Sequence, residues 1–259
     1  MIPKIRGKQI SLPIPHLLNE VSNLVKQGVK EIILIAQDST RYGGDIYGKP
    51  QLFELLEQIE RLEGDFQYRV LYLYPDVLTL KQLEKLTKFQ KFIPYFDLPL
   101  QHSASTVLQR MGRFYDEKAI HKLLNFIKTT FPVHFIRTNI IIGFPGETET
   151  EFQHLKAFIT QNHFNNIALF EYHDEPLAKS FQLPEKKEEK VIHTRFRELH
   201  QLVNQLLISR AQTRKGKEEW GYIVEAPLSL HHTKKQKQSR LVVRPRLHCP
   251  EIDEVDEIL

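Results

Sequence analysis

The residues best suited to chemistry are polar side chains that directly follow runs of branched apolar residues. Gln37 and Asp38 follow the first such run, and Gln101 and His102 follow the third. Ligands of parallel βα architectures bind at the carboxyl ends of the strands, where such side chains gather. These positions therefore predict one binding site for a small polar ligand. A turn after the fourth run adds Gly143, Phe144, Pro145, Gly146 and Glu147.

Each of these segments also has a purely structural interpretation. Gln101 and His102 can hydrogen-bond a ribose or simply end a strand, because a single histidine is more often structural than catalytic. Asp38 can accept a hydrogen bond from an ammonium group or form an Asx turn. Gly143 and Gly146 can let the backbone approach a ligand or form an ordinary tight turn before a helix. The residue types alone leave both interpretations open.

Arg137 lies inside a predicted apolar strand. A cation in such a place needs a carboxylate partner, which is either a buried acid or the ligand itself. The sequence contains no Gly-x-Ser-x-Gly, no phosphate-binding Walker loop and no His-Glu-x-x-His. Taken alone, these residues predict a βα enzyme that binds a ligand with amino and carboxylate groups, without naming its reaction.

Apolar runs alternate with segments of helical periodicity, which is typical of parallel βα units. Capping-box patterns begin two of the expected helices, at Thr79 with Gln82 and at Thr148 with Glu151. Gly28 is placed to end the first helix in a left-handed conformation. Five strands are predicted, at residues 31–36, 68–74, 92–98, 134–142 and 166–172.

A long final helix is predicted from about residue 186 to about 214, followed by alternating, strand-like residue patterns at 222–225 and 240–244. We expect a βα domain over residues 1–213 and a small all-β domain over 214–259, too short to bury a core alone. A right-handed crossover would also place a strand before the first helix. The expected fold class is α/β, a partial parallel (β/α)6 barrel lacking its first strand, with an incomplete β domain.

Composition narrows the class of protein further. No run approaches the roughly 18 apolar residues of a membrane span, and the amino terminus has no secretory pattern, so we expect a cytoplasmic protein. The single cysteine, Cys249, excludes a disulfide framework and a cysteine-based metal site built from this chain alone. The net charge of +4 is concentrated over residues 210–246 and predicts a solvated basic surface or a nucleic-acid contact.

Four blocks, taken in order, resemble the radical S-adenosylmethionine (SAM) methylthiotransferase family. They are residues 36–43 (AQDSTRYG), Tyr74-Pro75, residues 97–102 (DLPLQH) with Met111 and Arg113, and residues 137–148 (RTNIIIGFPGET). The branch that modifies an aspartyl residue of ribosomal small-subunit protein twelve, the RimO type, resembles the chain more closely than the transfer-RNA (MiaB) type. Pro250-Glu-Ile-Asp253 also favours that branch.

The resemblance implies SAM and 4Fe-4S clusters as cofactors. The cluster cysteines are expected upstream of Met1 and absent from this chain, which is therefore expected to be inactive alone. The SAM contacts that the resemblance implies are Gln37 and Asp38 at the amino group, Gln101 and His102 at the ribose, Arg137 at the carboxylate, and the turn from Gly143 to Glu147 beneath the adenine or methionyl part.

The implied substrate is a ribosomal small-subunit protein. The end of the chain resembles an incomplete TRAM module, and its basic residues suit a contact with ribosomal RNA; we expect a monomer. Ser11-Leu12 and Tyr172-His-Asp-Glu-Pro depart from the family pattern. The alternatives are a cluster-free module that binds ribosomal protein or RNA, a transfer-RNA methylthiotransferase, and an ordinary aldolase or isomerase barrel, for which no suitable lysine or carboxylate pair is apparent.

Overall fold

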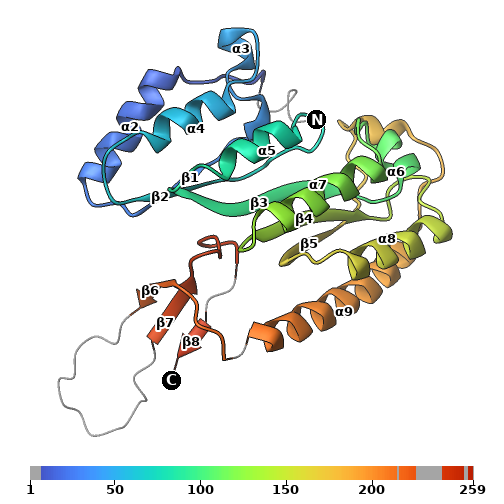
Figure 1. Ribbon diagram of the computed structural model, residues 1–259. Helices are drawn as coiled ribbons and strands as arrows, with labels where there is room; N and C mark the ends of the chain where they lie inside the picture. Colours follow the sequence, from blue (N-terminus) through green and yellow to red (C-terminus); the bar gives the residue numbers. More distant parts are fainter. Residues whose placement is uncertain (1–6, 215, 226–240, 254–255, 259) are drawn as a thin grey trace, which may run out of the picture. The chain divides into compact units, whose positions relative to one another are not determined.

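A parallel sheet of five strands forms the centre of the first of two compact units, Met1–Ser209. The computed structural model describes residues 7–214, 216–225, 241–253 and 256–258. The strands lie side by side in chain order, all parallel, so each βα unit adds one strand to the same sheet (Figure 1). The five predicted strands are confirmed as β1 (Glu31–Leu34), β2 (Gln67–Val70), β3 (Phe92–Gln101), β4 (Phe135–Ile142) and β5 (Asn166–Glu171).

The ends of β2 and β3 differ most from the prediction, and β1 stops at Leu34 instead of residue 36. β2 stops at Val70, because Tyr72 takes a positive φ of 57° and its backbone N–H donates to the Asp97 carboxylate at 2.9 Å. β3 continues to Gln101, and its pairing with β4 shifts register between Leu98 and Gln101. Pro99, which lies in this shift, has no N–H for the ladder. Local apolar patterning gives no sign of either change.

Helices cover one face of the sheet and share a large apolar core with it (Figure 1). Both predicted capping boxes are confirmed, and Gly28 follows the first helix with a φ of 92°. The helices are α2 (Ile14–Lys26), α3 (Gly44–Tyr47), α4 (Leu52–Glu60), α5 (Leu80–Leu86), α6 (Ser105–Arg110), α7 (Glu117–Thr130), α8 (Glu149–Gln161) and α9 (Glu189–Arg214), with short 3-10 turns η1 (Ser39–Arg41) and η2 (Lys179–Gln182).

The second compact unit, Arg210–Leu259, contains an antiparallel sheet. Its strands are β6 (Gly221–Glu225), β7 (Leu241–Pro245) and β8 (Asp256–Ile258), in that order. A small β unit after the last helix is therefore confirmed. Cys249 is fully buried in this unit, where its backbone N–H donates to Asp253 at 2.8 Å.

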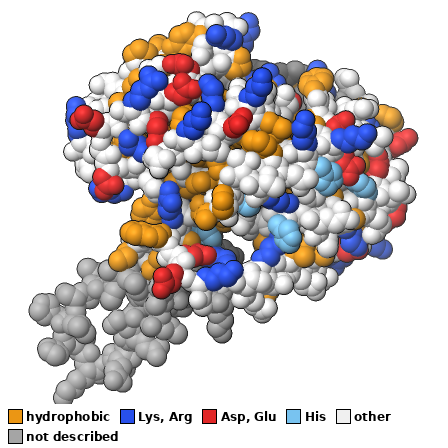
Figure 2. Space-filling model, in the orientation of Figure 1, with side chains coloured by type: hydrophobic (Ala, Val, Ile, Leu, Met, Phe, Trp, Pro, Cys, Tyr) orange, Lys and Arg blue, Asp and Glu red, His pale blue; other side chains and the backbone are white. Residues whose placement is uncertain are grey.

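The expected basic surface near the end of the chain is only partly visible. Lys215, Lys234, Lys235, Lys237 and Arg240 lie outside the described residues. Arg244 is buried with its guanidinium 4.6 Å from the Tyr222 ring centroid, and Arg214 pairs with Glu219. On the face of the molecule in Figure 2, basic and acidic side chains of the described residues are interspersed. No described helix is long and apolar enough to cross a membrane.

Candidate functional site

The carboxyl ends of the parallel strands form one edge of the sheet, and the predicted segments follow it. Gln37 and Asp38 lie after β1, His102 directly follows β3, and the turn at 143–147 joins β4 to α8. Arg137 lies within β4, and Gln101 is the last residue of β3. The topology therefore brings segments far apart in sequence to the same edge, as parallel strands require.

Asp38 is part of an ion-pair network beside β1. Its carboxylate accepts from the Thr40 hydroxyl and, at 2.9 Å, from Arg41 Nε. Arg41 also donates to Asp76 at 2.7 Å, which links the segments after β1 and β2. Asp38 occupies the cap position of η1 but makes no side-chain capping bond. The neighbouring Gln37 is exposed and available to a ligand.

Gln101 and His102 end β3 in a strained bend. Gln101 has a φ of 70°, a left-handed conformation that non-glycine residues rarely adopt. His102 is fully buried, and its Nδ1 accepts from the backbone N–H of Ala104 at 3.0 Å. This bond assigns the ring proton to Nε2. Nε2 lies 3.6 Å from Glu147 Oε2, so the histidine faces the turn after β4.

The backbone conformation favours glycine at both positions of that turn, and packing restricts Gly143 in addition. Gly143 and Gly146 have φ values of 78° and 79°. A Cβ on Gly143 would lie 2.5 Å from Ile192 of α9, and one on Gly146 would lie 3.0 Å from Arg110 of α6. Neighbouring side chains thus occupy the space that the missing Cβ atoms leave in this tight turn.

Arg137 pairs with Asp97, its direct neighbour on β3, at 2.8 Å. Of the two carboxylate partners that the sequence allowed, the structure shows the buried acid. Arg137, Asn139 and Ile141 share one face of β4, because side chains alternate along a strand. Ile136, Ile140 and Ile142 belong to the apolar core, so Arg137 and Asn139 point to the face opposite the helices.

Asn139 provides the observation that fits SAM. Its Oδ1 is buried and has no hydrogen-bond partner among the described residues. A buried acceptor without a donor is costly and is rare in folded proteins. The ammonium group of an amino-acid ligand would supply that donor beside Arg137, whose guanidinium suits a carboxylate. The residues present therefore fit the aminocarboxylate end of SAM.

The residues do not fit an iron-sulfur cluster. Such clusters are held by several cysteine thiolates, and this chain has one cysteine. Among the described residues there is also no group of three or more His, Cys, Asp or Glu side chains that could hold a metal ion. We therefore assign no cluster to the residues of this chain.

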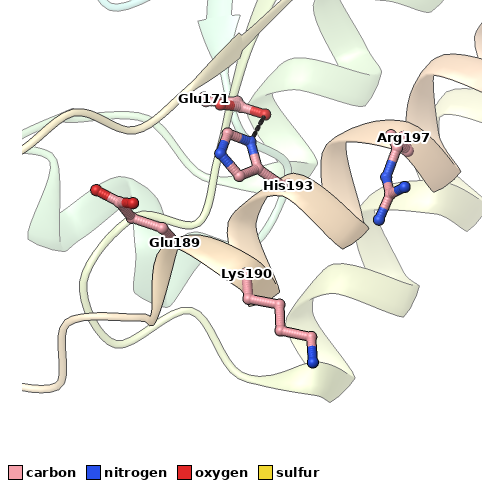
Figure 3. A pocket seen from close by; sticks show the side chains of 5 residues that line it. All are labelled: Glu171, Glu189, Lys190, His193 and Arg197. Carbon is pink, nitrogen blue, oxygen red and sulfur yellow. Dashed lines mark hydrogen bonds and ion pairs between the residues drawn. The ribbon is translucent and has the colours of Figure 1, made fainter.

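Two surface hollows lie elsewhere in the first unit. One, of about 500 Å³, is lined by Glu171 and by Glu189, Lys190, His193 and Arg197 of α9. Figure 3 shows His193 bonded to Glu171, whereas Lys190 and Arg197 extend away from that pair. Because these charged side chains point in different directions, we assign no ligand to this hollow. The second hollow, of about 550 Å³, lies beside Asp76 and the exposed Phe114.

Comparison with known proteins shows which superfamily the chain belongs to. The profile of the Radical SAM superfamily matches residues 1–159. The chain therefore belongs to the radical SAM superfamily, as the resemblance indicated. A solved structure, the cobalamin-dependent S-adenosylmethionine radical enzyme OxsB, overlaps with 82% of this chain and 32% of its own at 10% identity and a TM-score of 0.46.

More specific similarity comes from curated sequences. The chain is 36% identical over 252 residues to the ribosomal protein uS12 methylthiotransferase RimO of Pseudothermotoga lettingae, covering 97% of this chain and 56% of the relative. The protein of the same name from Thermotoga petrophila is 37% identical over 254 residues, covering 98% and 57%. The chain thus spans little more than half the length of these relatives.

Three residues of the site were not singled out from the sequence. Asn139 lies two residues after Arg137 on β4, and Asp97 lies beside Arg137 on β3, so both are on the face that carries Arg137. The alternation of side chains along a strand could have indicated them. Arg195 lies near the start of α9, 48 residues after Glu147, and contacts it directly. No local pattern signals such a contact, since α9 returns to the turn only in the folded chain.

Proposed function

We propose that this chain binds SAM on the open face and carboxyl edge of its parallel sheet, as the SAM-binding part of a methylthiotransferase of ribosomal protein uS12. The superfamily match and the names of the relatives support the reaction class and the substrate. The observation that carries the site is the buried, unpartnered Oδ1 of Asn139 next to the Asp97–Arg137 pair.

Each residue of the proposed site has a defined task. Arg137 binds the SAM carboxylate, and because a guanidinium has five N–H donors, Asp97 can share it. Asn139 accepts from the SAM ammonium group, and Gln37 and Asp38 approach the same group from β1. The ribose lies near Gln101 and His102, and the backbone of residues 143–147 lines the adenine or methionyl part.

In the superfamily a bound 4Fe-4S cluster supplies the electron that cleaves SAM. Its thiolates are not provided by this chain, so the residues described here bind and orient SAM and exclude water from it. We propose further that the target of the complete protein is an aspartyl residue, that the protein acts in the cytoplasm as a monomer, and that the basic residues near the end of the chain contact ribosomal RNA.

Replacing Asn139 with leucine tests the SAM site. The Asn139→Leu variant removes a buried acceptor that has no partner, so the free energy of unfolding should stay the same or rise. SAM should bind about tenfold more weakly, as expected for the loss of one hydrogen bond to a charged group. Equilibrium dialysis with SAM and urea unfolding measure the two effects.

The matched control is Asn204→Leu, which changes an exposed asparagine of α9 and should leave the SAM dissociation constant unchanged. Equal SAM affinity of the wild type and Asn139→Leu would remove Asn139 from the site. A wild-type chain that binds no SAM at millimolar concentration would contradict the proposed function itself.

A further inference from the structure

Helix α9 contacts the turn after β4 at two points. Ile192 fills the space beside Gly143, where its side-chain carbon lies 2.5 Å from the Cβ position that glycine leaves empty. One turn later, Arg195 reaches Glu147 at the other end of the same turn. Both side chains are buried. The first half of α9 is therefore packed against the segment to which we assign SAM contacts.

Arg195 makes a buried, multidentate contact. Its Nη1 donates to Glu147 Oε1 at 2.5 Å and to the Glu147 backbone carbonyl at 3.2 Å. Its Nη2 donates to Glu149 at 2.8 Å. The guanidinium also lies 5.0 Å from the ring centroid of Phe152, a distance typical of a cation-π contact. Glu149 is mostly exposed, whereas the Glu147 side chain is fully buried.

The second oxygen of Glu147 extends this contact into the turn. Oε2 accepts from the backbone N–H of Gly143 at 2.9 Å and faces His102 Nε2 at 3.6 Å. One carboxylate thus joins both ends of the turn and α9, while His102 Nε2 lies near it without a hydrogen bond. A buried charge pair contributes little net stability, but it fixes geometry because each partner is costly to leave unpaired.

We propose that Arg195 is a positioning residue, which holds the Glu147 carboxylate and through it the backbone of residues 143–147 in the conformation that contacts SAM. This inference rests on the proposed function. Glu147 acts in it as the link between Arg195 and Gly143, since both of its oxygens already have partners in the protein.

The test compares three variants of the chain. Arg195→Met removes the donors but keeps an apolar stem over Phe152, and Arg195→Lys returns one cationic donor. Glu149→Gln is the matched control, because it removes the charge of the exposed partner and leaves Glu147 bound. Thermal unfolding of each variant establishes that it is folded at the temperature of the measurements.

Amide hydrogen exchange gives a readout that does not need SAM. The Gly143 amide is bonded to the Glu147 carboxylate, whereas the Gly146 amide in the same turn is bonded to the Glu185 carbonyl at 3.0 Å. Arg195→Met should therefore accelerate exchange at Gly143 about tenfold relative to Gly146, and Arg195→Lys should restore part of the protection. A general loss of stability would accelerate both amides alike.

The SAM dissociation constant gives the second readout. Arg195→Met should weaken SAM binding about tenfold, the change that corresponds to one charge-assisted hydrogen bond, and Glu149→Gln should not change it. Unaltered relative exchange at Gly143, or unaltered SAM affinity despite altered exchange, would overturn the positioning role. If the wild type binds no SAM but Arg195→Met still accelerates exchange at Gly143, only the assignment of SAM contacts to the turn would be contradicted.

Discussion

Gly143 and Gly112 have similar backbone conformations in very different surroundings. Their φ values are 78° and 72°, both in the left-handed region. A Cβ on Gly143 would overlap with Ile192, whereas a Cβ on Gly112 would meet nothing within 4 Å. The pair therefore separates the cost of backbone strain from the cost of close packing, two reasons for glycine that a sequence cannot distinguish.

We expect Gly112→Ala to lower the free energy of unfolding by about 1–2 kcal/mol, the cost of a left-handed residue with a Cβ. Gly143→Ala should lower it by roughly 1–3 kcal/mol more, because overpacking adds to the strain. Urea unfolding measures both. Adding Ile192→Ala should recover part of the loss only in the Gly143→Ala background; purely additive effects would show that Ile192 does not restrict this position.

At the scale of elements, helices α5 and α8 begin with the same capping box but with different chemistry. Thr79 and Gln82 cap α5 with neutral groups, whereas Thr148 and Glu151 cap α8 with a carboxylate. Burial raises the pKa of Glu151, but hydrogen bonds from Thr106 and Thr148 and the nearby Arg110 guanidinium outweigh it and lower that pKa to about 2. Only the α8 box should therefore depend on pH.

Because the folded pKa of Glu151 lies below its ordinary value of 4.5, its ionised form stabilises the fold above pH 4.5, and this stability is lost as pH falls toward 2. Glu151→Gln should thus destabilise the protein at pH 7 and much less near pH 2.5. Urea unfolding at the two pH values measures the difference. Thr79→Ala serves as the control, with a loss of about 1 kcal/mol at both; equal losses for Glu151→Gln at both pH values would contradict the assignment.

At the scale of the whole molecule, the cysteine content limits what this chain does alone. Cys249 is the single cysteine and is fully buried in the second unit. Anaerobic reconstitution with iron and sulfide should therefore give no stoichiometric 4Fe-4S cluster, because one thiolate does not hold it. Iron and sulfide analysis with absorption spectroscopy measures this. Four irons per chain that are lost in Cys249→Ser would contradict the expectation.

The alternative of an RNA-binding module is also a question for the whole molecule. Arg214 and Arg244 are engaged inside the second unit, with Glu219 and with the Tyr222 ring. Because these two arginines already contact the protein, fewer cationic groups are available to RNA than the formal charge suggests. The steep salt dependence of phosphate binding would distinguish this alternative from a SAM-binding domain.

The sequence by itself determined the parallel βα architecture, the five strands, the capped helices and the superfamily. These features depend on short-range periodicity and on motifs that are read within about a dozen residues, such as Thr148 with Glu151. The polar segments after β1, β3 and β4 could be predicted for the same reason, since strand ends are local features and parallel strands share one carboxyl edge.

Only the tertiary structure decided which of these residues are engaged with the protein. Arg137 with Asp97 and Glu147 with Arg195 are separated by 40 or more residues in sequence, so nothing local identifies the partner. The unpartnered Asn139 oxygen is equally invisible in the sequence, because burial without a donor is a property of the surrounding packing.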